Sequence, residues 1–459
     1  MHFNNFLSNK TRNHSFSKSK IDNLNSIPFS KDDYKILESP ITFRETLLKL
    51  INNAKSRICI NALYLQHDEA GIEILNAIAQ TIKNNPNLYV RIYVDFHRAQ
   101  RGLCGKGPQI GNNVWYQQFA KENNLSLNIF GVPVKKREIF GVLHLKGFVI
   151  DNTVLYSGAS INNVYLQKFD RYRIDRYHLI NSKELADCMC DYCTTAFHET
   201  NAVQDLCKVD VPKAKELYKD IAQQKKILMK QQYVFHGSPL KSNHLSLTPL
   251  VGLGKKKNNL NKTILQLINI AKTNVVIHTP YFNLPSPMLK AVNKALQRGV
   301  NISLIVGDKT ANDFYIKPNE DFNKVGGVPY LYELNLKKFI NDHQTYINKG
   351  QLIINLWKDN DNTFHVKGLE VDSTYILITG NNFNPRAWGL DLENGVLIYD
   401  KDQKLKDQLI SERQFLLKNT TVIKNSNELE SFENYPLPVQ KLLKKVKNFR
   451  VQWLLKKLL

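Results

Sequence analysis

The chain has 459 residues, 42% of them hydrophobic and 23% charged, which excludes an intrinsically disordered protein and requires more than one ordinary hydrophobic core. No apolar run reaches the roughly 18 residues of a membrane-spanning helix, and residues 1–20 lack the apolar segment of a secretion signal, so we expect a cytoplasmic protein. The net charge of +22 predicts anionic partners such as a membrane surface, phosphorylated substrates or nucleic acid, and it permits nonspecific association with nucleic acid or ribosomes.

The first predicted elements alternate between helix and strand. Apolar residues at helical spacing predict a helix from Phe43, and a run rich in β-branched residues predicts a buried strand at 57–64. A second helix at about 72–82 and a second strand at 88–94 follow, and this strand ends at Asp95. Strands that alternate with helices in this way form a largely parallel sheet with helices on both faces.

The same pattern recurs in the second half of the chain. Three landmarks and their counterparts are Thr46 and Thr263, Asp95 and Asp308, and His144 and His365, which lie 217, 213 and 221 positions apart. A nearly constant offset over so much of the chain indicates an internal duplication. We therefore predict an α/β fold of two pseudo-symmetric halves, each with a mostly parallel or mixed sheet flanked by helices, packed around one shared site.

The composition also predicts segment boundaries. The segments are a polar N-terminal tail at 1–35, a first half at 36–205, a Lys- and Gln-rich helical connector at 206–246, a second half at 247–425, and a basic amphipathic segment at 426–459. In the last segment Leu442, Val446, Phe449 and Trp453 recur at helical spacing between many lysines. This pattern is typical of a helix that lies in a lipid interface, and a terminal helix docked on the core has it as well.

The most informative motif is His-x-Lys followed by four residues and Asp, which occurs twice. Its residues are His144, Lys146 and Asp151 in the first half and His365, Lys367 and Asp372 in the second. Each motif reads as a strand on which His and Lys share one face, while the Asp falls in a hairpin turn and is not expected to touch substrate. Two imidazoles and two ammonium groups at matched spacing indicate one phosphate-handling site built from both halves.

Polar residues that follow each hairpin supply further candidates. Ser160 and Asn162, and in the second half Asn382 and Asn384, are spaced to alternate onto one face, where they would donate to phosphate oxygens. Asp175 and Glu393 come next, each at the opening of a predicted strand. A carboxylate there would bind an imidazole nitrogen and fix its tautomer, so both are candidate partners of the motif histidines.

The sequence predicts no metal and no other cofactor. Cys190-x-x-Cys193 is half of a zinc-site pattern, but no second pair or His follows at the required spacing. No carboxylate cluster suited to Mg²⁺ is evident either. We expect the six cysteines to be reduced, packed thiols.

At this point the motifs resemble a known family. The two His-x-Lys-x4-Asp segments are similar to those of the phospholipase D superfamily, and longer stretches resemble one branch, the CDP-diacylglycerol–serine O-phosphatidyltransferases of the Gram-negative type. Besides Tyr64, the stretches that carry this likeness are 95–102, 131–133, 155–160, 279–285, 307–315 and 380–388. One departure concerns the Gly-Ser-x-Asn of the superfamily, which is one residue longer in both halves of this chain.

The resemblance implies a reaction of CDP-diacylglycerol with L-serine that yields phosphatidylserine and CMP through a phosphatidyl-histidine. It favours His144 as the nucleophile and His365 as the acid and base, although the symmetry of the sequence does not decide between them. Lys146 and Lys367 would neutralise phosphate charge, and Arg386 is a candidate for the serine carboxylate. The substrate lies in a bilayer, so we expect peripheral attachment to the inner face of the cell membrane.

Other functions use the same residues. A cardiolipin synthase or a lipid hydrolase would use another acceptor, and a nuclease would use the positive charge to hold a nucleic acid. A noncatalytic scaffold on anionic membranes would not need every catalytic residue twice. The sequence does not indicate an oligomeric state, because one chain carries both motifs.

Overall fold

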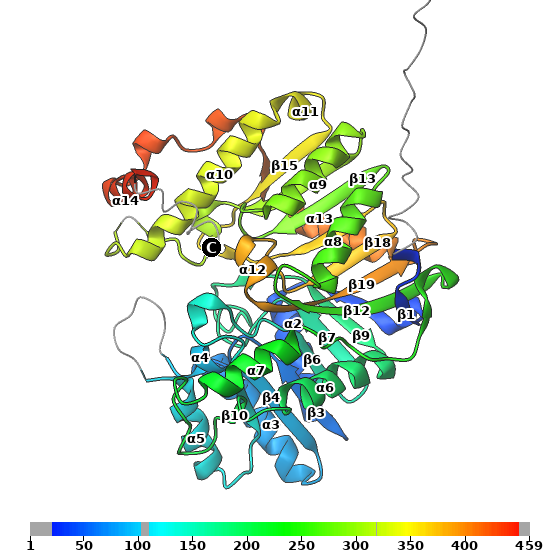
Figure 1. The fold of residues 1–459 in the computed structure, drawn as a ribbon, viewed down its shortest axis with the longest axis vertical. Helices are drawn as coiled ribbons and strands as arrows, with labels where there is room; N and C mark the ends of the chain where they lie inside the picture. Colours follow the sequence, from blue (N-terminus) through cyan, green and yellow to red (C-terminus); the bar gives the residue numbers. More distant parts are fainter. Residues whose placement is uncertain (1–20, 102–109, 318, 449–459) are drawn as a thin grey trace, which may run out of the picture.

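The computed structural model describes residues 21–101, 110–317 and 319–448. Two α/β halves lie one above the other, the first in blue to cyan and the second in green to red (Figure 1). Each half has a mixed sheet flanked by helices, as predicted, and the two sheets contain eight and ten strands. Among the described residues, no helix is long and apolar enough to cross a membrane.

The sheet of the first half has the strand order β10-β5-β4-β3-β6-β7-β9-β2. Its strands are β2 (Tyr34–Leu37), β3 (Arg57–Asn61), β4 (Tyr89–Asp95), β5 (Ile129–Val132), β6 (Gly147–Ile150), β7 (Thr153–Ser157), β9 (Tyr177–Asn181) and β10 (Gln204–Asp205). Strands β3, β4 and β5 are parallel, whereas β6, β7 and β9 are joined in antiparallel pairs. The helices of this half are α2 (Pro40–Asn52), α3 (Glu69–Asn84), α4 (Phe96–Ala99), α5 (Asn112–Glu122) and α6 (Lys183–Phe197).

The second half repeats this plan in the order β11-β1-β12-β19-β18-β17-β13-β14-β15-β20. Its own strands are β11 (Ser238–Pro239), β12 (Leu245–Leu253), β13 (Asn274–Thr279), β14 (Asn301–Gly307), β15 (Leu352–Trp357), β17 (Gly368–Val371), β18 (Tyr375–Thr379), β19 (Leu392–Asp400) and β20 (Thr420–Val422). The parallel set β13, β14 and β15 corresponds to β3, β4 and β5, and β17, β18 and β19 correspond to β6, β7 and β9. The helices are α8 (Asn259–Ile270), α9 (Ser286–Gln297), α10 (Val328–Asp342), α11 (Gln344–Asn348), α12 (Pro385–Gly389), α13 (Lys406–Leu417) and α14 (Leu437–Asn448).

Local sequence explains the first helix of the repeat. The Ser39 side chain accepts a hydrogen bond from the Thr42 N–H, and Pro40 occupies the first turn, where its missing N–H costs nothing. Phe43, Leu47 and Ile51 recur every four residues, and each is fully buried. The periodicity that predicted a helix from Phe43 therefore faces the core of the first half.

The N-terminal segment differs from the prediction of a polar tail through residue 35. Strand β1 (Asn25–Pro28) pairs with β11 and β12 in the sheet of the second half, and β2 closes the sheet of the first half. Ile21 and Ile27 are buried, Ile21 in the core of the second half. The apolar residues here are too few and too widely spaced among polar ones to form a recognisable periodic pattern.

A third core joins the two halves. It contains Val149 and Ile180 from the first sheet together with Val251, Val396 and Ile398 from the second. The connector contributes α7 (Tyr218–Leu228), which packs against α6 of the first half. The halves are therefore held together by buried apolar surface, which fixes any site between them.

Candidate active site

Both motif histidines lie where the two halves meet, each beside a short segment of the other half. Strand β16 (Thr363–Phe364) runs parallel to β8 (Arg173–Ile174), and the His365 N–H donates to the Ile174 carbonyl at 2.8 Å. At the equivalent position of the first motif, Leu143 and Leu392 form a parallel bridge. The His144 N–H donates to the Leu392 carbonyl at 3.0 Å. Each histidine is thus held opposite the acid that follows on the other half.

The two predicted carboxylates do contact the imidazoles. His144 Nδ1 lies 2.9 Å from Glu393 Oε2, and His365 Nδ1 lies 3.3 Å from Asp175 Oδ2. Each pair joins residues of different halves, so neither half alone holds a complete histidine–acid pair. With Nδ1 bound to the carboxylate, Nε2 of each ring is the nitrogen available to a substrate.

The prediction that His and Lys lie on a strand is wrong in both halves. Strand β6 begins only at Gly147 and β17 only at Gly368. These glycines directly follow the motif lysines and have φ values of +135° and +156°, which side chains rarely adopt. The chain therefore bends away from the sheet, and the His-x-Lys segments extend across to the opposite half.

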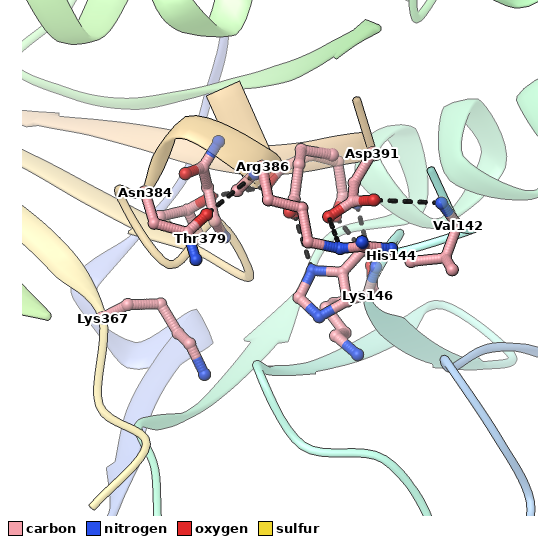
Figure 2. Close-up of polar contacts among 12 residues, drawn as sticks. Val142, His144, Lys146, Lys367, Thr379, Asn384, Arg386 and Asp391 are labelled. Atoms are coloured by element: carbon pink, nitrogen blue, oxygen red, sulfur yellow. Dashed lines mark hydrogen bonds and ion pairs between the residues drawn. The ribbon is translucent and has the colours of Figure 1, made fainter. Parts of the chain in front are cut away.

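The motif lysines are almost completely buried, and each has a polar partner. Lys146 Nζ donates to Ser160 Oγ at 3.3 Å, whereas Lys367 Nζ donates to Asp175 Oδ2 at 2.9 Å and also contacts His365. Figure 2 shows the two lysines on either side of the His144 ring, and burial together with the charges of both lysines lowers the pKa of this imidazole. This places two ammonium groups beside the imidazoles, which suits a phosphate group.

Burial and neighbouring charge shift the protonation of these groups. The pKa of His144 is lowered well below its ordinary value by burial and by the charge of Lys146, and the pKa of His365 falls to about 4 through burial and Lys367. Burial and Lys367 lower the pKa of Lys146 to about 7, and burial also lowers the pKa of Lys367. An anionic ligand would offset this positive charge and favour the protonated forms.

The two acids differ in their electrostatic surroundings. Burial alone would raise the pKa of Asp175, but Lys367 and His365 outweigh it and hold this pKa below the ordinary value. Burial and nearby Asp391 raise the pKa of Glu393 well above its ordinary value. The His365 imidazole therefore has an ionised carboxylate beside it, whereas the His144 imidazole has one that is harder to ionise.

The motif aspartates lie in hairpin turns, as predicted. Asp151 and Asp372 have φ values of +52° and +53°. The Asp151 carboxylate accepts hydrogen bonds from the backbone N–H groups of residues 55–57 and from Ser56 Oγ, at 2.7 to 3.2 Å. Asp372 does the same with residues 272–274, at 2.9 to 3.2 Å. Each carboxylate thus ties its hairpin to the loop before the first strand of its repeat.

The polar residues after each hairpin lie in loops, and they do not alternate along a strand as predicted. Ser160 contacts Lys146, but Asn162 Oδ1 accepts from the Tyr165 N–H and Asn384 Oδ1 accepts from the Ala387 N–H. Asn162 and Asn384 therefore shape their own loops through their carbonyl oxygens. Asn382 Oδ1 is buried without a hydrogen-bond partner among the described residues.

Arg386 joins the halves at the edge of the site. Its guanidinium donates to the carbonyls of Glu138 and Ile139 at 2.8 and 3.2 Å, and its Nε lies 3.2 Å from Asp391 Oδ2. Asp391 in turn accepts from the Val142 N–H at 3.0 Å (Figure 2). Arg386 is the residue that the sequence suggested for the serine carboxylate, and three of its guanidinium nitrogens are thus directed at protein groups.

The sequence did not indicate several residues of the site. Tyr165 Oη is hydrogen bonded to His365 Nδ1 at 2.9 Å, and the Asn394 side chain bonds both the N–H and the carbonyl of Lys146, at 2.9 and 2.8 Å. Gly158 and Gly380 lie against the motif lysines, because a Cβ atom would come within 2.7 Å of Lys367 Nζ and within 2.6 Å of Lys146 Cγ, respectively. The two glycines could have been predicted, because a Gly follows the second hairpin strand in both halves. Tyr165 and Asn394 have no repeated counterpart in the other half.

Metal chemistry has no evident ligands in the part of the chain that the structure describes. Within those residues, no three His, Cys, Asp or Glu side chains are grouped as a metal ion would require. The described cysteines are Cys59, Cys188, Cys190, Cys193 and Cys207, and none of them forms a disulfide.

Comparisons with known proteins agree with this geometry. Residues 264–414 match the family model of the phospholipase D-like domain of cardiolipin synthase. The CDP-diacylglycerol–serine O-phosphatidyltransferase PssA of Escherichia coli is 46% identical over 437 residues, which cover 95% of this chain and 96% of that protein. The enzyme of the same name from Haemophilus influenzae is 45% identical, over 95% of this chain and 98% of that protein.

The fold comparison leads to the same group. The crystal structure of phosphatidylserine synthase from Haemophilus influenzae superposes with a TM-score of 0.93 at 43% identity, over 97% of this chain and 99% of that one. Sequence and fold thus agree over nearly the full length of both proteins. The chain belongs to the CDP-diacylglycerol–serine O-phosphatidyltransferase family, a branch of the phospholipase D superfamily.

Proposed function

We propose that the chain transfers the phosphatidyl group of CDP-diacylglycerol to the hydroxyl of L-serine, which gives phosphatidylserine and CMP. The main support is the presence of two acid-bound imidazoles and two buried lysines where the halves meet. A two-step transfer needs one imidazole as nucleophile and another as acid and base. Relatives that carry this activity in their names are similar over almost the whole chain.

In the first step, His144 Nε2 attacks the phosphorus attached to diacylglycerol. A P–N bond forms, the P–O bond to CMP breaks, and His365 donates a proton to the departing oxygen. The lowered pKa of His144, caused by burial and Lys146, keeps this ring neutral and nucleophilic. The pKa of His365 is also lowered, to about 4, by burial and Lys367, but the ionised Asp175 beside this ring and the negative charge of a bound phosphate both favour a proton there. Lys146 and Lys367 offset the charge of the phosphate.

In the second step, His365 removes the proton of the serine hydroxyl. The hydroxyl oxygen attacks the same phosphorus, a P–O bond forms, and the P–N bond to His144 breaks. His144 leaves as a neutral imidazole and His365 is protonated again, so the catalyst returns to its starting state. The divided reaction replaces one difficult displacement by two easier ones.

Trapping the covalent intermediate tests these roles. CDP-diacylglycerol labelled in its phosphatidyl phosphate is mixed with enzyme and quenched in base, which preserves phospho-histidine. His144→Ala is expected to form no labelled protein, whereas His365→Ala is expected to form it slowly and then retain it. Either change should lower serine transfer by at least about 10²-fold, the usual contribution of acid–base assistance.

A matched control and a product assay complete the test. His244 forms a surface pair with Asp402 at 2.8 Å, and His244→Ala is expected to retain full activity. Labelled protein at normal yield from His144→Ala would reverse the two histidine roles. Release of phosphatidic acid without phosphatidylserine, in mixed micelles that contain serine, would contradict the transferase assignment and favour a hydrolase.

We also propose peripheral attachment to the inner face of the cell membrane. The net charge of +22 suits an anionic leaflet, and Ile139 and Phe140, about half exposed, lie beside the carbonyls that bind Arg386 at the edge of the site. In α14, Val439 and Leu443 pack on Tyr330 and Tyr435, so this part of the C-terminal helix is docked on the protein. The side chain of Val446 and the residues Phe449 and Trp453, which were predicted to face lipid, lie outside the part of the chain that the structure describes.

A short truncation tests the membrane proposal without disturbing the docked turns. Removal of residues 449–459 leaves Val439 and Leu443 in place. Binding to anionic liposomes at low salt is expected to weaken about tenfold, since the segment contains three basic and several apolar residues. Equal co-sedimentation of truncated and full-length protein would contradict a role for this segment, and equal binding to zwitterionic vesicles would contradict the role of charge.

A further inference from the structure

A largely buried ion pair lies near the His365 end of the site and has no part in the steps above. Arg173 Nη1 lies 3.3 Å from Asp313 Oδ2, and the two side chains are only 12% and 21% exposed. The Arg173 guanidinium also lies 4.8 Å from the centre of the Tyr165 ring, whose hydroxyl is bonded to His365. One aromatic ring therefore separates this ion pair from the imidazole that acts on serine.

Both members of the pair keep hydrogen-bonding capacity. Asp313 Oδ1 is buried and has no hydrogen-bond partner among the described residues. Arg173 donates from Nε to Thr363 Oγ1 at 3.0 Å and contacts Asp313 through Nη1, which uses two of the five N–H donors of its guanidinium. A buried carboxylate oxygen without a partner is costly, so its presence indicates a ligand that completes its hydrogen bonding.

Three tyrosines, Tyr64, Tyr165 and Tyr281, lie close to the Arg173 guanidinium. Burial opposes ionisation of Asp313, but Arg173 and His365 outweigh it and lower the pKa of this carboxyl. Burial raises the pKa of Tyr64, Tyr165 and Tyr281, which keeps their hydroxyls neutral. One cation and one anion between neutral rings match a small zwitterion.

We infer that Arg173 and Asp313 bind the amino-acid part of the acceptor, with the serine carboxylate on Arg173, the ammonium on Asp313 and the hydroxyl directed at His365. This inference rests on the proposed function. In the β8–β16 ladder, Arg173 is opposite Thr363, two residues before His365, and two residues of a strand span roughly 7 Å. A serine molecule with hydrogen bonds of about 3 Å at each end covers that separation.

Such a site explains how serine is chosen over other acceptors. Water and the hydroxyl groups of glycerol lipids have no carboxylate and ammonium pair. They would therefore leave the hydrogen-bonding groups of Asp313 and Arg173 without partners. A site built to bond polar groups discriminates strongly against molecules that lack them. The covalent intermediate is thereby directed to serine, and wasteful hydrolysis is limited.

Steady-state kinetics of Asp313→Asn test the inference in mixed micelles. The KM for L-serine is expected to rise about 10- to 100-fold, the effect of losing one charge-assisted hydrogen bond, whereas the KM for CDP-diacylglycerol rises far less. The preference for serine over 3-hydroxypropionate, which lacks the ammonium group, should fall by a similar factor. Arg173→Lys keeps the charge but loses the planar fork, so its KM for serine should also rise.

Asp361→Asn is the matched control, because Asp361 forms an exposed ion pair with Lys317 and is 66% exposed. Its KM for serine is expected to remain that of the wild type. If Asp313→Asn does not fold, Asp313→Glu retains the charge, and an unchanged KM for serine in that variant would refute the inference. An equal rise in KM for L-serine and for CDP-diacylglycerol, or a fall in kcat alone, would also refute the inference. Failure of the wild-type protein to use serine would instead contradict the proposed function.

Discussion

Lys146 is the motif lysine whose pKa lies close to neutral pH. Burial and the nearby Lys367 lower its pKa to about 7, so in the free enzyme its ammonium form predominates below pH 7 and its neutral amine above. Only the ammonium form offsets phosphate charge. We therefore expect the part of kcat/KM for CDP-diacylglycerol that depends on the Lys146 charge to decline as the pH rises through about 7, since this parameter reports groups of the free enzyme. Initial rates between pH 5 and 9 at constant ionic strength measure the decline.

Lys146→Arg identifies the group responsible for that decline. A guanidinium stays protonated throughout the range, so the alkaline decline should move upward even if the overall rate falls. Lys367→Arg serves as the comparison for Lys146→Arg, because the ionised Asp175 is a charge partner of Lys367. A decline that stays near pH 7 in Lys146→Arg would assign it to another group.

Asp175 and Glu393 have matched positions but unequal surroundings, which predicts unequal effects. Asp175→Asn and Glu393→Gln should each lower kcat by about 10²-fold or more, because each removes the carboxylate that holds an imidazole. Asp175→Asn should also destabilise the fold by about 3 kcal/mol, since it leaves the buried Lys367 without its charge partner. Thermal unfolding of both variants checks this, and equal stability losses would contradict the asymmetry.

Much of the site could be predicted from the sequence because duplication made its residues visible twice. The histidines, the lysines and the two acids all have counterparts in both halves. The sequence did not reveal that each acid serves the histidine of the other half, because that pairing depends on how the halves pack. A search for repeated polar residues does not detect Tyr165, Arg173 or Asp313, so these residues were not predicted as part of the site.

At the level of elements, the hairpin turns are the most readable features and the strand boundaries the least. Asp151 interrupts an apolar run, and its carboxylate and positive φ fit the turn that this interruption predicted. The strand was expected to begin at His144, because nothing in the hydrophobic pattern separates His144 and Lys146 from the residues that follow. Gly147 is the local cause of the difference, since its φ of +135° redirects the chain.

Asp151→Asn tests the structural role of the turn. Burial opposes ionisation of Asp151, but hydrogen bonds from Ser56 and the neighbouring backbone lower its pKa. Because the folded-state pKa is depressed, its contribution to stability is present above the ordinary carboxyl pKa and disappears as the pH falls through the folded value. At pH 7 the variant should lose about 1–3 kcal/mol of unfolding free energy. Denaturant unfolding at pH 7 and pH 3 measures it; normal stability with abolished turnover would refute the structural role.

Over the whole molecule, the halves exchange segments more than the duplication alone suggests. Strand β1 lies in the sheet of the second half although it begins the chain, and the Ile36 N–H in β2 donates to Gln408 of α13 at 3.0 Å. Arg176 of the first half forms an ion pair with Glu412 of α13 at 2.6 Å. Such long-range pairings carry little local signal, so no local pattern indicated that the tail ends before residue 35. Together with the two histidine–acid pairs, they join residues of one half to residues of the other.

Ile21 offers a direct test of which half the N-terminal segment stabilises. Its side chain is fully buried in the core of the second half, whereas Ile51 of α2 is fully buried in the core of the first. Each Ile→Ala change is expected to cost about 2–5 kcal/mol. Hydrogen exchange should locate the loss of protection in β12 and α8 for Ile21→Ala, and in α2 and β3 for Ile51→Ala. Loss confined to the first half in both variants would contradict the assignment of the N-terminal segment to the second.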